Sequence, residues 1–454
     1  MRMKFFAMLA GLAGFAVVSA GTAQAQAQQS PPTYHCGELS DNNLPQIKTI
    51  FRSNTDLSEN NFDCLAWQDF IYFMWPANTE SGHRGEPNFY AKFGAGGPTV
   101  WETYKTADAV FLPNGQNPGP WNQPRLLGTL KGRLAQQVDQ GAVRHLTETS
   151  KVSRSVLANI LRDSVGTPPD ILDEIAQAGG GTLYDLNGYP VYYEVAMNRM
   201  QYEYITGNKL YDANKQQAYA ASNVIALPAG TSNTTEGAVE VKAAWKVLTP
   251  AEKSSGHFHM VQALLGGSQQ SVTVGLVGFH AFISNGSQGA WATFAQVDNA
   301  PVQHPAISGT FNFFNPKCTV LVTPPCPFNV KDADPGQVVQ ITPNADQATM
   351  LNAYMHYILQ GYSPWQYYNL VDVQWATIPV QVASLPAPKS VPLPDGQPNT
   401  PTLVNAVLET FLQQPNVGCI SCHQYAKVAP TAGQTPSYAA GYSFAFKGAQ
   451  PGPK

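Results

Sequence analysis

Two cysteines and a histidine form a compact cluster near the end of the 454-residue chain, in the segment CISCH at residues 419–423. Thiolate and imidazole groups are typical ligands of metals and metal-containing cofactors. Only 31 residues follow His423, and the last methionine of the chain is Met355. A tail of this length cannot bury a core of its own. The preceding chain must therefore fold back to complete the surroundings of this cluster.

The first residues have the pattern of an export signal. Arg2 and Lys4 precede the apolar run FFAMLAGLAGFAVV, and small residues follow it up to AQAQA. This order predicts a secretory signal peptide over residues 1–27 that is cleaved, and hence a periplasmic or secreted protein. No other stretch approaches the roughly 18 apolar residues needed to cross a bilayer. We therefore expect no membrane span.

The composition excludes one class of partner. Charged residues make up 12% of the chain, and 26 basic residues stand against 30 acidic ones. The sequence contains no basic cluster, which argues against a nucleic-acid partner. The 38 glycines and 36 prolines predict many long loops.

The six cysteines separate into two groups. An exported chain meets an oxidising compartment, so disulfide bonds are expected. Cys318 and Cys326 flank a short proline-rich loop, and Cys36 and Cys64 bracket the N-terminal segment, which makes Cys36–Cys64 and Cys318–Cys326 the predicted pairs. Cys419 and Cys422 are then left for another role.

Hydrophobic patterns along the chain predict the α+β class, as one large mixed domain with a central antiparallel β-sheet, flanking helices and long loops rich in proline and glycine. Expected elements are helices at 64–78, 141–178, 345–361 and 401–414, a hairpin around Asn187-Gly188, and successive strands between 236 and 300. We expect a mixed α+β body over 28–400. Residues 401–454 are expected to form a C-terminal helix and a cofactor-attachment segment packed on that body.

The pattern of two cysteines, two intervening residues and a following histidine is that of c-type haem attachment. At this spacing both thiols reach the vinyl groups along one porphyrin edge and form thioethers, and the histidine turns its ring toward the iron. The sequence thus predicts one covalent haem c, with Cys419 and Cys422 as thioether sites and His423 as the proximal iron ligand.

Three other readings of the same cluster are weaker. A thioredoxin-type redox site should open a helix inside a βαβ pattern, whereas this cluster follows a predicted helix and a proline-rich chain. A structural zinc site needs a second cysteine or histidine pair at a suitable spacing, and none is nearby. A disulfide between Cys419 and Cys422 would close a very small, strained loop.

A sixth iron ligand must come from upstream of the cluster. His280 lies in the strand pattern VGLVGFHAFIS, on one face with Leu276, Gly278 and Phe282, where the glycine leaves room for a flat ring. A core histidine bonded to the backbone is the alternative for this position.

His257 and His259 share one face of their predicted strand and form a second candidate pair. The alternative is a polar surface face. We therefore name His280 or His259 as the candidate sixth ligand, while the upstream methionines read as core residues.

Several segments together resemble exported bacterial proteins of the cytochrome c family with a single C-terminal haem motif. The resemblance extends from about residue 64 to the end and implies haem binding and electron transfer in a general sense. It is carried by the segments AWQDFIYFMWPA, RGEPN, GPTVWETYKTADAVF, YPVYYEVAMNR, AVEVKAAWKVL, VGLVGFHAFI, WATFAQVDNAP and CISCHQYA.

Three functions agree with these features. The first is an exported one-haem electron carrier whose partner is a redox protein or a small electron donor or acceptor. The second is a haem enzyme, peroxidase-like or oxygenase-like, with an open sixth iron site, and the third is a haem-based ligand sensor. The identity of the sixth ligand separates the first from the other two.

Overall fold

The computed structural model describes residues 59–124, 132–149, 181–230, 236–266, 268, 270–302, 309–318, 327–341, 344–362, 364–431 and 438–453. All of them belong to a unit that spans residues 32–454. The predicted signal peptide, Cys36 and Cys326 lie outside the described residues. Within the described ranges, no helix is long and apolar enough to cross a membrane.

Helices and strands of the described residues form a mixed α+β structure around one eight-stranded sheet. The strands are β1 (Lys105–Thr106), β2 (Val143–Leu146), β3 (Tyr192–Met197), β4 (Val239–Val247), β5 (Met260–Leu265), β6 (Ser271–Ile283), β7 (Ala290–Gln296) and β8 (Tyr368–Trp375). Their order is β1-β3-β4-β6-β5-β2, and β7 joins β6 to β8. All pairings are antiparallel except that of β2 with β5.

Short helices and irregular chain surround this sheet. The α-helices are α1 (Glu59–Phe73), α2 (Ala107–Val110), α3 (Gly132–Asp139), α6 (Arg199–Gly207), α7 (Ala213–Ala220), α8 (Pro250–Ser255), α9 (Asp346–Ile358) and α10 (Cys419–His423). The 3-10 turns are η2 (Trp101–Thr103), η3 (Pro113–Gly115), η4 (Trp365–Tyr367), η5 (Val382–Ser384), η6 (Thr410–Leu412) and η7 (Phe444–Gly448).

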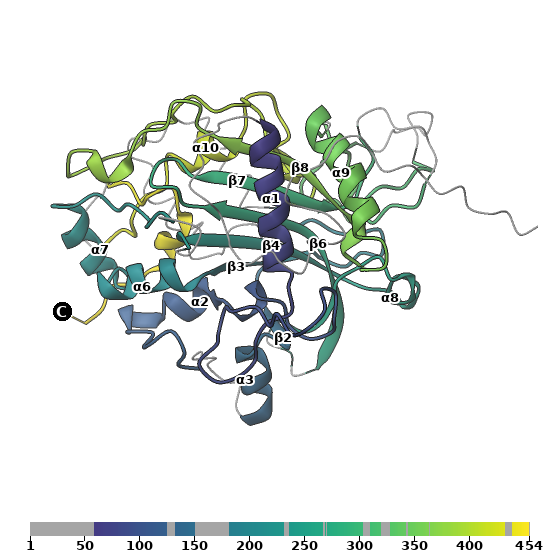
Figure 1. Cartoon of the computed structure of the whole chain (residues 1–454), viewed down its shortest axis with the longest axis horizontal. Coiled ribbons are helices and arrows are strands. Elements are labelled where there is room, and N and C mark those ends of the chain that lie inside the picture. Colours follow the sequence, from purple (N-terminus) through teal and green to yellow (C-terminus); the bar gives the residue numbers. More distant parts are fainter. Residues whose placement is uncertain are drawn as a thin grey trace, which may run out of the picture. The chain divides into compact units, whose positions relative to one another are not determined.

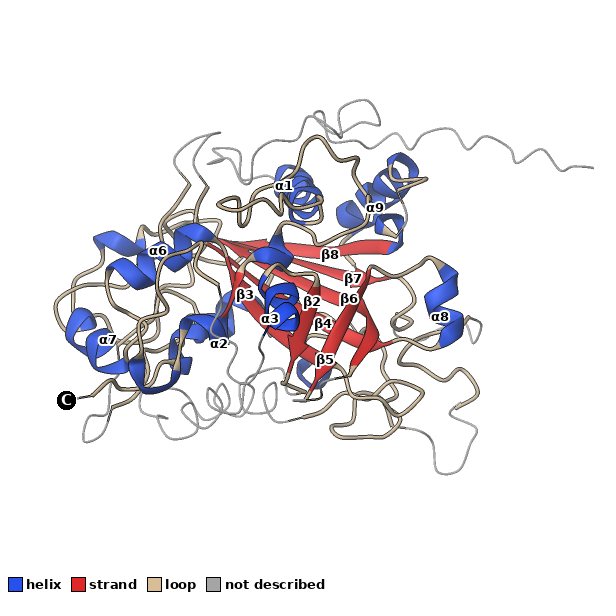
Figure 2. Cartoon of the chain, turned by 90° about the horizontal axis from the view of Figure 1, so that it is seen from below, coloured by secondary structure: helices blue, strands red, loops and turns tan. Residues whose placement is uncertain are grey.

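One face of the sheet is covered by α1 and α9, which lie together on one side of the strands (Figures 1 and 2). The predicted helices at 64–78 and 345–361 correspond to these two helices. Phe70 of α1 stacks on Phe294 of β7 at a centroid distance of 4.3 Å and meets Phe279 of β6 edge-on at 6.0 Å. Buried aromatic contacts of this kind fix the helices on what we call the helix face.

The opposite face of the sheet, which we call the cavity face, carries the side chains that alternate along each strand with those of the helix face. Lys242 of β4, His280 of β6 and Thr293 of β7 lie next to one another because the strand register pairs them. Irregular chain after residue 402 covers it. The amide nitrogen of Asn405 donates to Thr293 Oγ1 over 2.9 Å, and Leu408 packs where Gly278 has no side chain.

The helix predicted at 401–414 is therefore wrong. Val404, Val407 and Leu408 are buried as their spacing suggested, but Val407 and Leu408 pack against the sheet and Val404 packs beside Leu412 and Val417 rather than along a helix. Oδ1 of Asn405 accepts hydrogen bonds from the backbone N–H groups of Val407 and Leu408, which turns the chain, and only the 3-10 turn η6 forms. Asparagine side chains compete with helical hydrogen bonds in this way.

Two other expectations changed. The region 141–178 was predicted to be helical, but Val143–Leu146 within it forms the strand β2. The part of this region beyond residue 149 lies outside the described residues. The predicted hairpin exists as a tight turn with an isolated bridge between Tyr184 and Pro190. Gly188 takes φ +76° in that turn, a conformation that favours glycine. The chain then leaves as β3, which pairs with β4.

The cysteines follow the expected division as far as they are described. Cys64 and Cys318 are disulfide-bonded, whereas neither Cys419 nor Cys422 forms a disulfide bond. Because the predicted partners of Cys64 and Cys318 lie outside the described residues, the two pairings stay predictions.

The strand β4 contains a bulge, and a charged side chain just beyond it, that of Lys246, is buried. The register between β4 and β6 shifts between Ala244 and Trp245. Lys246 beyond the bulge is only 1% exposed, and its Nζ lies 2.9 Å from Asp185 and 2.7 Å from Glu252. This buried ion pair ties β4 to the turn before β3.

Replacing Lys246 by methionine should therefore destabilise the fold. The substitution leaves the carboxylate of Asp185, which is 0% exposed, buried without its cation, at a cost of about 3–5 kcal/mol. Chemical denaturation measures the free energy of unfolding, with Lys253→Met on the exposed surface of α8 as the control. A Lys246→Met protein as stable as this control would contradict the role assigned to the ion pair.

Candidate functional site

The cysteine and histidine cluster forms the short helix α10, which is docked on the last strand of the sheet. The backbone N–H of Ile420 donates to Oε1 of Gln374 in β8 over 2.8 Å, and Ile420 is fully buried. Gly418 lies so close to this side chain that a Cβ atom there would approach Gln374 Nε2 to 2.5 Å. The serine between the cysteines closes the first turn, since Ser421 Oγ donates to the carbonyl of Gly418. The cluster is thus part of the body.

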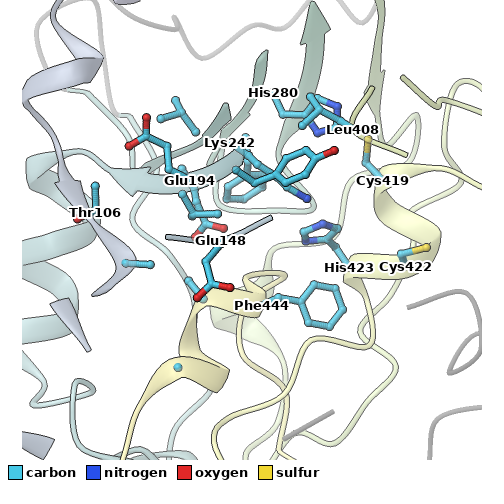
Figure 3. A pocket seen from close by; sticks show the side chains of 18 of the residues that line it. Thr106, Glu148, Glu194, Lys242, His280, Leu408, Cys419, Cys422, His423 and Phe444 are labelled. Atoms are coloured by element: carbon cyan, nitrogen blue, oxygen red, sulfur yellow. The ribbon is translucent and has the colours of Figure 1, made fainter. Parts of the chain in front are cut away.

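A cavity of about 350 Å³ lies between α10 and the cavity face. Cys419, Cys422 and His423 all line it, together with His280 and Lys242 from the opposite wall (Figure 3). Further apolar lining comes from Phe282, Trp291, Leu403, Leu408, Leu412, Val417 and Phe444. The volume and the mixture of apolar walls with a few polar groups are typical of a site for a small molecule or cofactor.

The imidazole of His423 is held in one orientation and one tautomer. Its Nδ1 lies 2.7 Å from the backbone carbonyl oxygen of Tyr442. A carbonyl oxygen only accepts hydrogen bonds, so Nδ1 carries the proton and Nε2 keeps its lone pair. A hydrogen bond from the second ring nitrogen to a backbone carbonyl is the usual support of a metal-bound histidine.

Burial lowers the pKa of His423 to about 4, and the charges of Lys242 and His280 act in the same direction, against the hydrogen bond to the Tyr442 carbonyl. The ring is therefore neutral at neutral pH, as ligation requires. Trp291 and Phe444 contact the ring at centroid distances of 4.3 and 4.9 Å and fix its tilt.

The two cysteines differ in their surroundings. Burial raises the pKa of the Cys419 thiol well above its usual range, so this thiol is protonated at neutral pH. Cys422 packs beside Val404, Leu412 and Val417, and in Figure 3 its sulfur points away from the ring of His423.

The histidine predicted on the cavity face is found there. His280 shares the lining of the cavity with His423, as its place in the strand pattern predicted. Its Nε2 lies 3.4 Å from Oε2 of Glu409. The approach lacks hydrogen-bond geometry, and this buried nitrogen has no hydrogen-bond partner.

The other predicted pair of histidines lies elsewhere. β5 begins at Met260, so His257 and His259 precede the strand. The Nε2 atom of His259 lies 2.9 Å from Glu102, and its ring stacks on Trp365 at 4.7 Å. His257 pairs with Asp298. Neither residue lines the cavity, so the structure does not support His259 as a sixth ligand.

The residues around the cavity fit a haem held through α10. Two thiols and a neutral imidazole with a free Nε2 border one cavity, and a buried nitrogen without a hydrogen-bond partner lies in its wall. In the described part of the chain, no three histidine, cysteine, aspartate or glutamate side chains gather as a site for a bare metal ion. Two thiols and one imidazole on a single helix form a donor set that a porphyrin, which brings its own nitrogens, can use.

Some residues of the site carried no signal in the sequence. Trp291, which contacts the ring of His423, lies 132 residues before it in the sequence, and Tyr442, whose carbonyl binds that ring, lies 19 residues after it. Glu409 lies inside the segment expected to be helical.

No known protein family, curated protein or solved structure matches the chain. The assignment of the site therefore depends on its own residues.

Replacing Gln374 by leucine should loosen the docking of α10. The change leaves the N–H of Ile420 and the carbonyl of Thr400 without their hydrogen bonds to this side chain. Unpaired buried groups of this kind cost about 1–3 kcal/mol. Thermal or chemical unfolding measures the loss, with Gln116→Leu on the exposed surface as a control that should stay within about 0.5 kcal/mol of the original protein. Equal stability of the two variants would show that Gln374 does not hold α10.

Proposed function

We propose that the protein is an exported c-type cytochrome with one haem. Cys419 and Cys422 form the thioethers, and His423 is an axial ligand of the iron. The iron supplies one-electron chemistry when the haem is bound, and the protein exchanges that electron with a redox protein or a small donor or acceptor in the periplasm or outside the cell. No nucleic acid takes part.

The observation that supports this proposal most strongly is the state of His423. Its Nδ1 donates to the carbonyl of Tyr442 over 2.7 Å, so Nε2 keeps the lone pair that a metal needs. A histidine with only a packing role needs neither a cavity beside it nor two cysteine thiols, both outside any disulfide, in the same helical turn. Here all three side chains border one cavity of about 350 Å³.

The chain's own residues would perform three tasks around the cofactor. The thiols of Cys419 and Cys422 would each add across a vinyl group, so that sulfur would bond to one carbon and the thiol hydrogen would go to the other. Trp291, Phe444 and the apolar lining exclude water from the iron. The sheet and the helix α10 hold the walls of the cavity in fixed positions, which keeps the rearrangement that accompanies electron transfer small.

A haem enzyme with an open sixth iron site is the second candidate. The polar part of the cavity lining favours it, because Lys242 and the carboxylates of Glu148, Glu194 and Glu240 border the cavity. Such groups can bind a polar substrate or transfer protons. An open site would bind cyanide or carbon monoxide at once, whereas a site closed by a protein ligand would not.

The thioether assignment is tested by replacing both cysteines with alanine. The exported wild-type protein should carry the mass of one porphyrin and keep it through acid–acetone extraction. Cys419→Ala/Cys422→Ala should lose that mass, and each single variant should keep one thioether with a shifted absorption maximum.

The control is His83→Ala, at a histidine in an exposed loop outside the cavity, which should keep the haem. A wild-type protein that is colourless and has the mass of the polypeptide alone would refute the proposed function.

A further inference from the structure

The cavity offers few candidates for a second axial ligand. Among the described residues that line it, the histidines besides His423 are His145 and His280, and there is no methionine. A methionine ligand, common in small cytochromes, therefore has no source in the described wall of this cavity. The choice lies between the two histidines and the amine of Lys242.

The position of His280 in the sheet favours it over His145. His280 lies in the middle of the sheet, paired with Lys242 of β4 on one side and Thr293 of β7 on the other. His145 lies in β2, at the end of the strand order.

The state of the His280 ring points to a missing partner. Its Nε2 is buried and makes no hydrogen bond, although buried polar atoms nearly always have a partner. The carboxylate of Glu409 lies 3.4 Å away and is itself held by the backbone N–H of Asn405 over 3.0 Å. Glu409 therefore approaches this nitrogen without satisfying it.

We propose that His280 is the second axial ligand of the haem held by Cys419, Cys422 and His423. This proposal rests on the proposed function. It makes the iron six-coordinate with two imidazole ligands. It therefore favours an electron carrier over an enzyme or sensor with an open site, and a lower potential than histidine and methionine ligands would give.

The test uses absorption and electron paramagnetic resonance spectra of the ferric, exported protein. The wild type should be low-spin. His280→Gly should become high-spin and bind cyanide at once, and added imidazole should restore the low-spin spectrum by entering the space of the deleted ring. His145→Gly, a change of the same size in the same cavity, should remain low-spin without imidazole.

A second variant keeps the test decisive if the glycine variant does not accumulate. His280→Met offers a thioether at the same position and should stay low-spin with a raised midpoint potential. An unchanged potential in this variant would overturn the proposal.

Other outcomes separate this proposal from the proposed function. A wild-type haem that is high-spin, or a His280→Gly protein that stays low-spin, overturns the ligand assignment and leaves haem attachment intact. Conversion to high-spin by Lys242→Met, with no effect of His280→Gly, would assign the ligand to Lys242 instead. A wild type without covalent haem overturns both proposals.

Discussion

The sheet has two faces to bury, and the site follows from the different ways in which the chain covers them. The helix face is closed by α1 and α9 through aromatic contacts such as Phe70 on Phe294. The cavity face is covered by irregular chain from the last part of the sequence, anchored by Asn405 on Thr293 and by Gln374 on Ile420. Irregular chain packs less closely on a sheet than a helix does. The cavity lies where this irregular chain and the sheet separate. Functional groups on loops above a rigid sheet are a common arrangement.

Fixed hydrogen bonds turn this cavity into a site with defined chemistry. The carbonyl of Tyr442 sets the tautomer of His423, and burial keeps the ring neutral. The opposite wall is set by strand pairing, which places His280 beside Lys242. Because α10 is hydrogen-bonded to β8 while His280 belongs to β6, one sheet supports both walls. An iron between them would move little when it changes oxidation state, which suits electron transfer.

Sequence patterns predicted the parts of this arrangement that depend on local periodicity. The helices α1 and α9 are long and apolar, and alternation along β6 placed His280 on the correct face. The helix expected at 401–414 did not form, because some of its apolar residues bury against the sheet and Asn405 turns the chain. β8 was not expected, since a proline-rich neighbourhood obscured it. His259 was placed by a strand pattern, but the strand begins one residue later and Glu102 binds its ring. Contacts of His423 with Trp291 and Tyr442 depend on tertiary folding and leave no pattern in the sequence.

The account rests on an iron porphyrin located between α10 and the cavity face. Anomalous diffraction from crystals of the exported protein, recorded on both sides of the iron absorption edge, locates that iron directly. The account predicts one iron peak per chain within bonding distance of His423 Nε2, on the side of the ring that faces His280, with continuous density to the sulfurs of Cys419 and Cys422. A chain without an iron peak, or a peak away from this cavity, would contradict it.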